Sequence, residues 1–127
     1  MMQVALPVNF NPLTPTSSIS ALPERVDLEL YRGDDFWVVL SVSPAMGQAF
    51  DLTGATARSQ IREEYDSETA FEMEASIDEQ VVTVHLTNQV SATLPACGVW
   101  DCQVTLSDAT VRTLVAGAVT VSPQVTR

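Results

Sequence analysis

The sequence predicts an all-β protein: a single antiparallel, immunoglobulin-like β-sandwich of about seven strands, preceded by an extended, proline-rich N-terminal arm. Two observations lead to this prediction. After residue 25, apolar and polar residues alternate with period two in most segments, as in half-buried strands. Turn residues separate these segments at short intervals, and no two of them enclose a long helical pattern, so a parallel α/β sheet is not expected. The length of 127 residues corresponds to one domain, and a hydrophobic content of 46% is enough for a core.

The predicted arm covers residues 1–24, which hold four of the seven prolines and no charged side chain before Glu24. Proline removes a backbone donor and biases the preceding residue toward extended conformations. The arm is nonetheless partly apolar, and its candidate partner-binding residues are Val4, Leu6, Val8, Phe10, Leu13, Ile19 and Leu22. These residues are expected to pack either on the protein's own domain or on a neighbouring molecule, and the sequence leaves both alternatives open.

The sandwich domain is expected over residues 25–127. Its first strand follows from alternating apolar and acidic residues at 26–30. The mostly apolar run at 36–42 predicts a strand buried on both faces or nearly so, with Trp37 in the core. A third strand is expected at 55–62, where the apolar residues are fewer.

The remaining strands are expected at 71–75, 82–86, 100–106 and 111–121. Residues 87–94 are short and polar, and they predict a single helical turn. Trp100 and Cys102 lie on the inward register of their strand. Val111, Thr113 and Val115 are assigned to one face of the last strand, Gly117 is expected at a β-bulge, and Pro123 should end the strand.

Charge excludes several classes of partner. The chain carries 16 acidic and 6 basic residues, all six of them arginine, for a net charge of −10. Such a balance repels phosphate backbones and anionic membrane surfaces, so neither nucleic acid nor a membrane is expected as a partner. No apolar stretch has the roughly 20 residues of a membrane span, and the first residues do not have the pattern of a signal peptide.

Residues suited to catalysis are scarce, so we expect no enzyme and no cofactor. The single histidine, His85, is predicted to point outward and has no recognisable serine or cysteine partner. Cys97 and Cys102 lack the second ligand pair of a zinc site and are expected as free thiols in a reducing compartment. Cys97 precedes its strand and should be the more exposed and reactive of the two.

Half of the acidic residues lie between positions 63 and 79: Glu63, Glu64, Asp66, Glu68, Glu72, Glu74, Asp78 and Glu79. They could bind calcium, but they lack the ligand spacing and central glycine of an EF-hand loop. A solvated loop and the outer face of a strand are the favoured interpretation. A carbohydrate site would need aromatic platforms, whereas Trp37 and Trp100 are both expected in the core. Arg32-Gly33-Asp34 matches an adhesion tripeptide, but its glycine and aspartates are typical of a turn.

Several segments together resemble a family of small β-sandwich modules in tailed-phage virions, including the N-terminal domain of phage baseplate upper proteins. The resemblance spans about residues 26–122. The segments that carry it are Tyr31-Arg32-Gly33-Asp34-Asp35, Asp51-Leu52-Thr53-Gly54, Ile61-Arg62, Val82–Leu86, Gly98-Val99-Trp100-Asp101 and Leu114-Val115-Ala116-Gly117, followed by Val119 and Val121.

The resemblance implies a non-enzymatic docking or adaptor subunit of the tail, neck or baseplate, which attaches through its arm and sheet edges. The expected partners are other virion proteins and further copies of this chain, in a particle assembled in the host cytoplasm. Baseplate upper proteins continue into a long C-terminal region, whereas this chain ends at residue 127, which favours a stand-alone subunit. A capsid cement or decoration protein is the alternative, and a calcium- or carbohydrate-binding module is a third.

Overall fold

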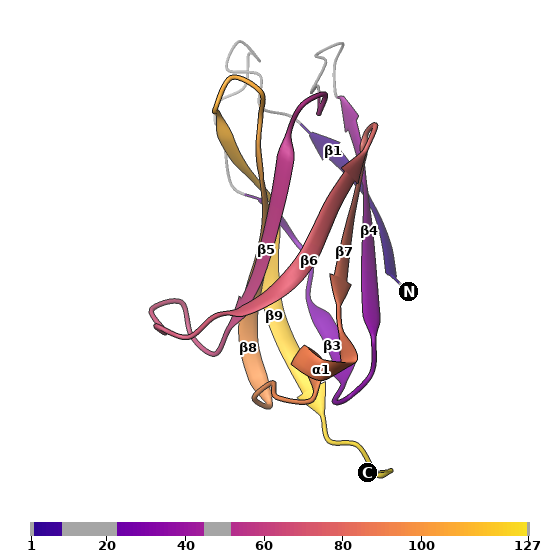
Figure 1. Ribbon diagram of the computed structural model, residues 1–127, viewed down its shortest axis with the longest axis vertical. Helices are drawn as coiled ribbons and strands as arrows, with labels where there is room; N and C mark the ends of the chain where they lie inside the picture. Colours follow the sequence, from indigo (N-terminus) through magenta and orange to yellow (C-terminus); the bar gives the residue numbers. More distant parts are fainter. Residues whose placement is uncertain (1, 9–22, 45–51, 127) are drawn as a thin grey trace.

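The computed structural model describes residues 2–8, 23–44 and 52–126, and regular structure in these ranges is almost entirely β-strand (Figure 1). The strands are β1 (Met2–Val8), β2 (Glu24–Arg25), β3 (Leu28–Tyr31), β4 (Phe36–Pro44), β5 (Thr56–Arg62), β6 (Phe71–Asp78), β7 (Val81–Leu86), β8 (Cys97–Thr105) and β9 (Val111–Ser122). One short helix, α1 (Asn88–Ser91), follows β7.

The strands form one mixed sheet in the order β1-β4-β7-β6-β5-β8-β9-β2, with β3 also paired to β9. Strand β6 belongs to both halves of this sheet, because Met73 pairs with β5 while Asp78 pairs with β7. In Figure 1, β6 runs obliquely from the side of β5 toward β7. We call β1, β4, β7 and the end of β6 the β4 half, and the remaining strands the β8 half.

The all-β prediction is confirmed, but the strand number and the pairing differ from expectation. Nine strands replace the expected seven among the described residues. Pairing is parallel rather than antiparallel for β1 with β4, and for β2 and β3 with β9. Strand β3 lies in the β8 half, whereas the next strand along the chain, β4, lies in the other half. The chain therefore crosses the molecule between β3 and β4. Crossovers of this kind, unlike hairpins, permit parallel neighbours.

The predicted arm contains one strand that the sequence did not reveal. Residues 2–8 form β1 at the edge of the β4 half, where Val4 pairs with Leu40 and Val8 with Pro44. The backbone of this stretch is therefore on the protein's own sheet, which was one of the two alternatives. Phe10, Leu13, Ile19 and Leu22 lie outside the described residues.

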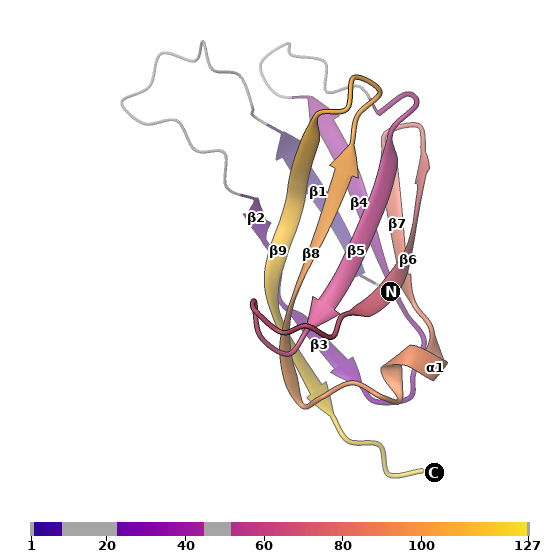
Figure 2. The same ribbon diagram turned by 60° about the vertical axis from the view of Figure 1, so that its left-hand side comes forward.

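A single apolar core joins the two halves of the sheet. In Figure 2, strands β5, β8 and β9 lie in front of β1 and β4. Its members follow the period-two alternation predicted from the sequence, with Leu28 and Leu30 buried on β3, and Val82 and Val84 buried on β7. Trp100 is also confirmed in the core, where its Nε1 donates a hydrogen bond to the Val26 carbonyl at 2.7 Å. This bond fixes the segment between β2 and β3 to strand β8.

The expectation that β4 is buried on both faces is wrong. Val38, Leu40 and Val42 point into the core, whereas Trp37 on the opposite face is 41% exposed. Among the described residues, no second layer covers that outer face, so alternation along the strand leaves Trp37 at the surface.

The β-bulge of β9 lies at Leu114 rather than at Gly117. Cys102 pairs with Val115 and Gln103 with Thr113, so Leu114 is the extra residue. On the N-terminal side of Leu114, the extra residue reverses which positions of β9 point inward. Val111, predicted to share a face with Val115, is therefore 49% exposed.

Gly117 is required instead by a close approach of backbones. A Cβ at this position would lie 2.0 Å from the Val26 carbonyl oxygen and 2.8 Å from Asp27 Oδ1. The same Asp27 oxygen accepts a hydrogen bond from the Ala118 backbone at 2.9 Å, and this bond is the main reason that the pKa of Asp27 is lowered. The absence of a side chain at Gly117 therefore allows the β2–β3 segment to dock on β9.

Candidate functional site

The outer face of the β4 half presents a row of three side chains from three neighbouring strands. The strand register places Trp37 of β4 opposite His85 of β7, and His85 opposite Glu74 of β6. The rings of Trp37 and His85 are stacked, with centroids 4.5 Å apart and planes at 5°. His85 Nδ1 lies 3.4 Å from Glu74 Oε2, so the histidine connects an aromatic ring to a carboxylate.

Asp35, in the turn before β4, holds the other side of this histidine. Its Oδ1 accepts from His85 Nε2 at 3.0 Å and from the Asn88 backbone N–H at 3.1 Å, while Oδ2 accepts from Asn88 Nδ2 at 3.1 Å. Hydrogen bonds from Asn88, and then from His85, lower the pKa of Asp35. One carboxylate therefore ties the β3–β4 turn to β7 and to the start of α1.

The β3–β4 turn is fixed to α1 by a second contact. Gly33, with φ of +90°, donates its backbone N–H to Ser91 Oγ at 2.9 Å. A side chain at Gly33 would collide with Gln124 as well as strain the backbone. Arg32-Gly33-Asp34 therefore forms a tight turn that is packed against its neighbours, as the turn interpretation predicts.

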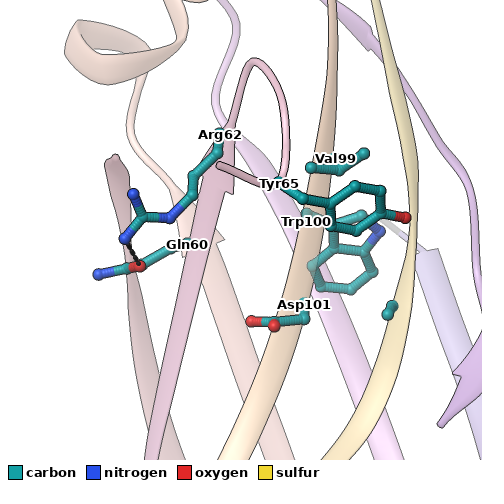
Figure 3. Close-up of a pocket in the computed structure, with 7 residues that line it drawn as sticks. Gln60, Arg62, Tyr65, Val99, Trp100 and Asp101 are labelled. Atoms are coloured by element: carbon teal, nitrogen blue, oxygen red, sulfur yellow. Dashed lines mark hydrogen bonds between the residues drawn. The ribbon is translucent and has the colours of Figure 1, made fainter. Parts of the chain in front are cut away.

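A small hollow lies on the outer face of the β8 half (Figure 3). Its volume is about 140 Å³, and it is lined by Gln60, Arg62, Tyr65, Val99, Trp100, Asp101 and Ala116. Tyr65 is 84% exposed and comes from the loop between β5 and β6. Arg62 donates to Gln60 Oε1 at 3.2 Å and also to the Ser67 carbonyl, which attaches this loop to β5.

The chemistry of this hollow is limited. Partial burial raises the pKa of Asp101, an effect that the nearby Arg62 opposes. The Trp100 nitrogen is already bonded to Val26, so the polar side chains of the lining are Gln60, Arg62, Tyr65 and Asp101. Sites for small molecules usually measure about 300–1,000 Å³. A volume near 140 Å³ is small for such a site.

The acidic residues of positions 63–79 do not converge. Glu72 pairs with Arg58 at 3.0 Å, Glu74 faces His85, and Glu63, Glu64, Asp66 and Glu68 are exposed in or beside the β5–β6 loop. Within the described ranges, no group of three or more His, Cys, Asp or Glu residues is arranged to hold a metal ion. The geometry agrees with the favoured interpretation of a solvated loop and an outer strand face.

Both cysteines are free, as predicted. Cys102 is buried, and burial raises the pKa of its thiol to about 12, with Asp101 adding to the shift. A thiol in this environment is unreactive. Cys97 is exposed at the first residue of β8, so it is the accessible thiol.

Of the partner-binding residues predicted in the arm, Val4, Leu6 and Val8 belong to β1. The functional candidates that the sequence missed are Asp35 and the Trp37–His85 pair. Alternation alone placed His85 outward, but its neighbours Asp35 and Trp37 come from positions about 50 residues away in the chain, which only the strand register brings together. In the described part of the chain, no helix has the length and apolar character of a membrane span.

Comparison with known proteins gives a likeness of fold. No family model matches the sequence, and no curated protein matches it by sequence. Among solved structures, the N-terminal domain of phage TP901-1 ORF48 is similar, with a TM-score of 0.55 and 8% sequence identity. The alignment covers 95% of this chain and 97% of that domain, so the likeness extends over nearly the whole of both chains.

Proposed function

We propose that this protein is a non-enzymatic structural subunit of a tailed-phage virion, a docking or adaptor protein of the tail, neck or baseplate. The observation that carries the proposal is the fold shared with a phage protein domain over 95% of the chain. The family resemblance of the turn and core segments in the sequence points in the same direction. The acidic surface, with a net charge of −10, fits contact with proteins better than contact with nucleic acid.

Attachment would use the arm and the edges of the sheet. Strand β1 forms one edge, and β2 and β3 lie along β9 at the other. Edge strands present unpaired backbone donors and acceptors that can accept a further strand from a partner. The apolar residues of the arm would add side-chain contacts, and several copies of the chain would assemble together in the particle.

Quantitative mass spectrometry of purified particles tests this proposal. A tail, neck or baseplate subunit is expected in tens of copies or fewer, counted against the major capsid protein. Hundreds of copies would instead favour the capsid cement alternative. Absence of the chain from purified particles would contradict both assignments.

Deletion of residues 1–22 tests the attachment. The truncated chain is expected to keep its β-rich circular dichroism spectrum, because the core residues that the structure describes all lie after position 25, and to be lost from particles. Incorporation at the level of the full chain would show that the arm and β1 are not the attachment element.

A further inference from the structure

Trp37 is an aromatic side chain presented at the surface by a rigid support. One neighbour in its row is His85, which stacks on it and is itself held by Asp35. On the other side, the register of β1 begins at Val38, one residue beyond Trp37. Trp37 itself is 41% exposed. Because the indole and imidazole are fixed before any partner arrives, binding would cost little side-chain entropy.

The three strands that carry this aromatic pair and Glu74, β4, β6 and β7, hold carboxylates but no lysine or arginine, and the nearest arginine along the chain is Arg32 in the β3–β4 turn. The arginines of the described strands lie on β2, β5 and β9. Glu74, with a side chain that is 72% exposed, and Asp35 both contact His85 of the stacked pair, and Asp78 lies farther along β6. The hydrogen bonds that lower the pKa of Asp35 keep its carboxylate ionised.

We propose that Trp37, His85, Asp35 and Glu74 form a docking surface for an arginine side chain of a neighbouring virion protein. This inference rests on the proposed function and names the chemistry of the partner. A guanidinium is planar and stacks on an indole, and it also forms forked hydrogen bonds with a carboxylate. A neutral sugar could stack on Trp37, but it would gain nothing from the negative charge of the two carboxylates that contact His85.

The two tryptophans of the chain provide an internally controlled test. Each indole N–H gives a separate NMR signal in protein labelled with ¹⁵N-tryptophan, and Trp100 is buried and already bonded to Val26. Titration with a tetra-arginine peptide at low salt is expected to shift the Trp37 signal saturably and to leave the Trp100 signal in place. No saturable shift, equal shifts of both signals, or the same shift with a tetraserine peptide would overturn the proposal.

Two charge-matched variants on the same strand separate this surface from general attraction. Glu74→Gln removes the carboxylate beside His85, whereas Glu72→Gln removes one that faces Arg58. Glu74→Gln is expected to weaken peptide binding about three- to tenfold, and Glu72→Gln less than twofold. Equal weakening by both variants would mean that only net charge matters, which would refute the docking surface.

Particle incorporation distinguishes this inference from the proposed function. If the wild-type chain is present in purified particles, Trp37→Ala, confirmed as folded by circular dichroism, is expected to be depleted. Incorporation of Trp37→Ala at the wild-type level would overturn this inference alone. Absence of the wild-type chain from particles would overturn the proposed function. It would also overturn the assignment of a virion protein as the partner of this surface.

Discussion

Substitution of Gly117 by alanine should strongly destabilise the fold, although the change adds one methyl group. The new Cβ would lie 2.0 Å from the Val26 carbonyl oxygen, whereas ordinary contact begins near 3.4 Å, so the Val26 backbone must move by about 1.4 Å. Such a displacement is too large for the hydrogen bonds of Val26 to survive at their present lengths.

The expected magnitude follows from these bonds. Moving Val26 breaks the 2.7 Å bond from Trp100 Nε1 and the 3.0 Å bond from the Val26 N–H to the Ala116 carbonyl. A buried donor left without a partner costs about 1–3 kcal/mol, and an ordinary backbone bond contributes about 1 kcal/mol. We therefore expect the free energy of unfolding of Gly117→Ala to fall by about 2–4 kcal/mol.

Urea denaturation followed by circular dichroism measures this loss, and Gly54→Ala is the matched control. Gly54 has φ of +74°, but a Cβ there would meet only Ser107 Cβ at 3.4 Å, so its cost of about 1 kcal/mol is conformational. A fully unfolded Gly117→Ala chain would agree with the prediction. A loss no larger than that of Gly54→Ala would refute the argument from close approach.

A double-mutant cycle tests the assigned mechanism. If Gly117→Ala already breaks the bond between Trp100 and Val26, then Trp100→Phe should cost at least about 1 kcal/mol less in that background than in the wild type. Additivity within about 0.5 kcal/mol would show that the methyl group is accommodated without loss of this bond.

Three further predictions concern the thiols, the carboxylates and a surface ion pair. Ellman's reagent should react with one thiol, Cys97, in the native protein and with both thiols in denaturant, because burial raises the pKa of Cys102 to about 12. Fast reaction of both thiols in the native protein would contradict this. Hydrogen bonds lower the pKa of Asp27, Asp35 and Asp108 from 3.8, so the stability that they contribute is complete above that pH and is lost as pH falls through the folded-state values. Urea midpoints between pH 2 and 6 should show this fall, and Asp35→Asn should make it shallower; an unchanged slope would exclude a contribution from Asp35. Arg58→Ala should change the free energy of unfolding by less than about 0.5 kcal/mol, because the pair with Glu72 is largely exposed, and a loss above about 1 kcal/mol in thermal unfolding would indicate a larger role.

The sequence predicted those parts of the fold that depend on local alternation. Val26, Leu28 and Leu30 alternate with acidic residues, and the structure buries all three. The uninterrupted apolar run around Trp37 contained no such information, because a run of apolar residues does not say which side of the strand is covered. Leu114 and Val115 are both buried, and only pairing with β8 shows which of them is the bulge residue.

The candidate docking surface was beyond sequence reasoning for a related reason. Trp37, His85 and Glu74 are brought together by the register of three strands, and Asp35 reaches His85 and Asn88 across about 50 positions. Register depends on which strands become neighbours, and the order β4-β7-β6 does not follow the order along the chain. The outward position of His85 was predictable, but its partners were not.

The pairing of β3 with β9 has a consequence for synthesis of the protein in the cell. Leu28 pairs with Val119, so among the described strands β3 has no partner until the ribosome has made β9, about 90 residues later. At a translation speed of about 5–20 residues per second, β3 waits roughly 5–18 s for β9. During that time the apolar face of β3 lacks its final strand neighbour. Nascent chains should therefore be protease-sensitive until β9 has left the ribosome, and folding should be completed in one late step.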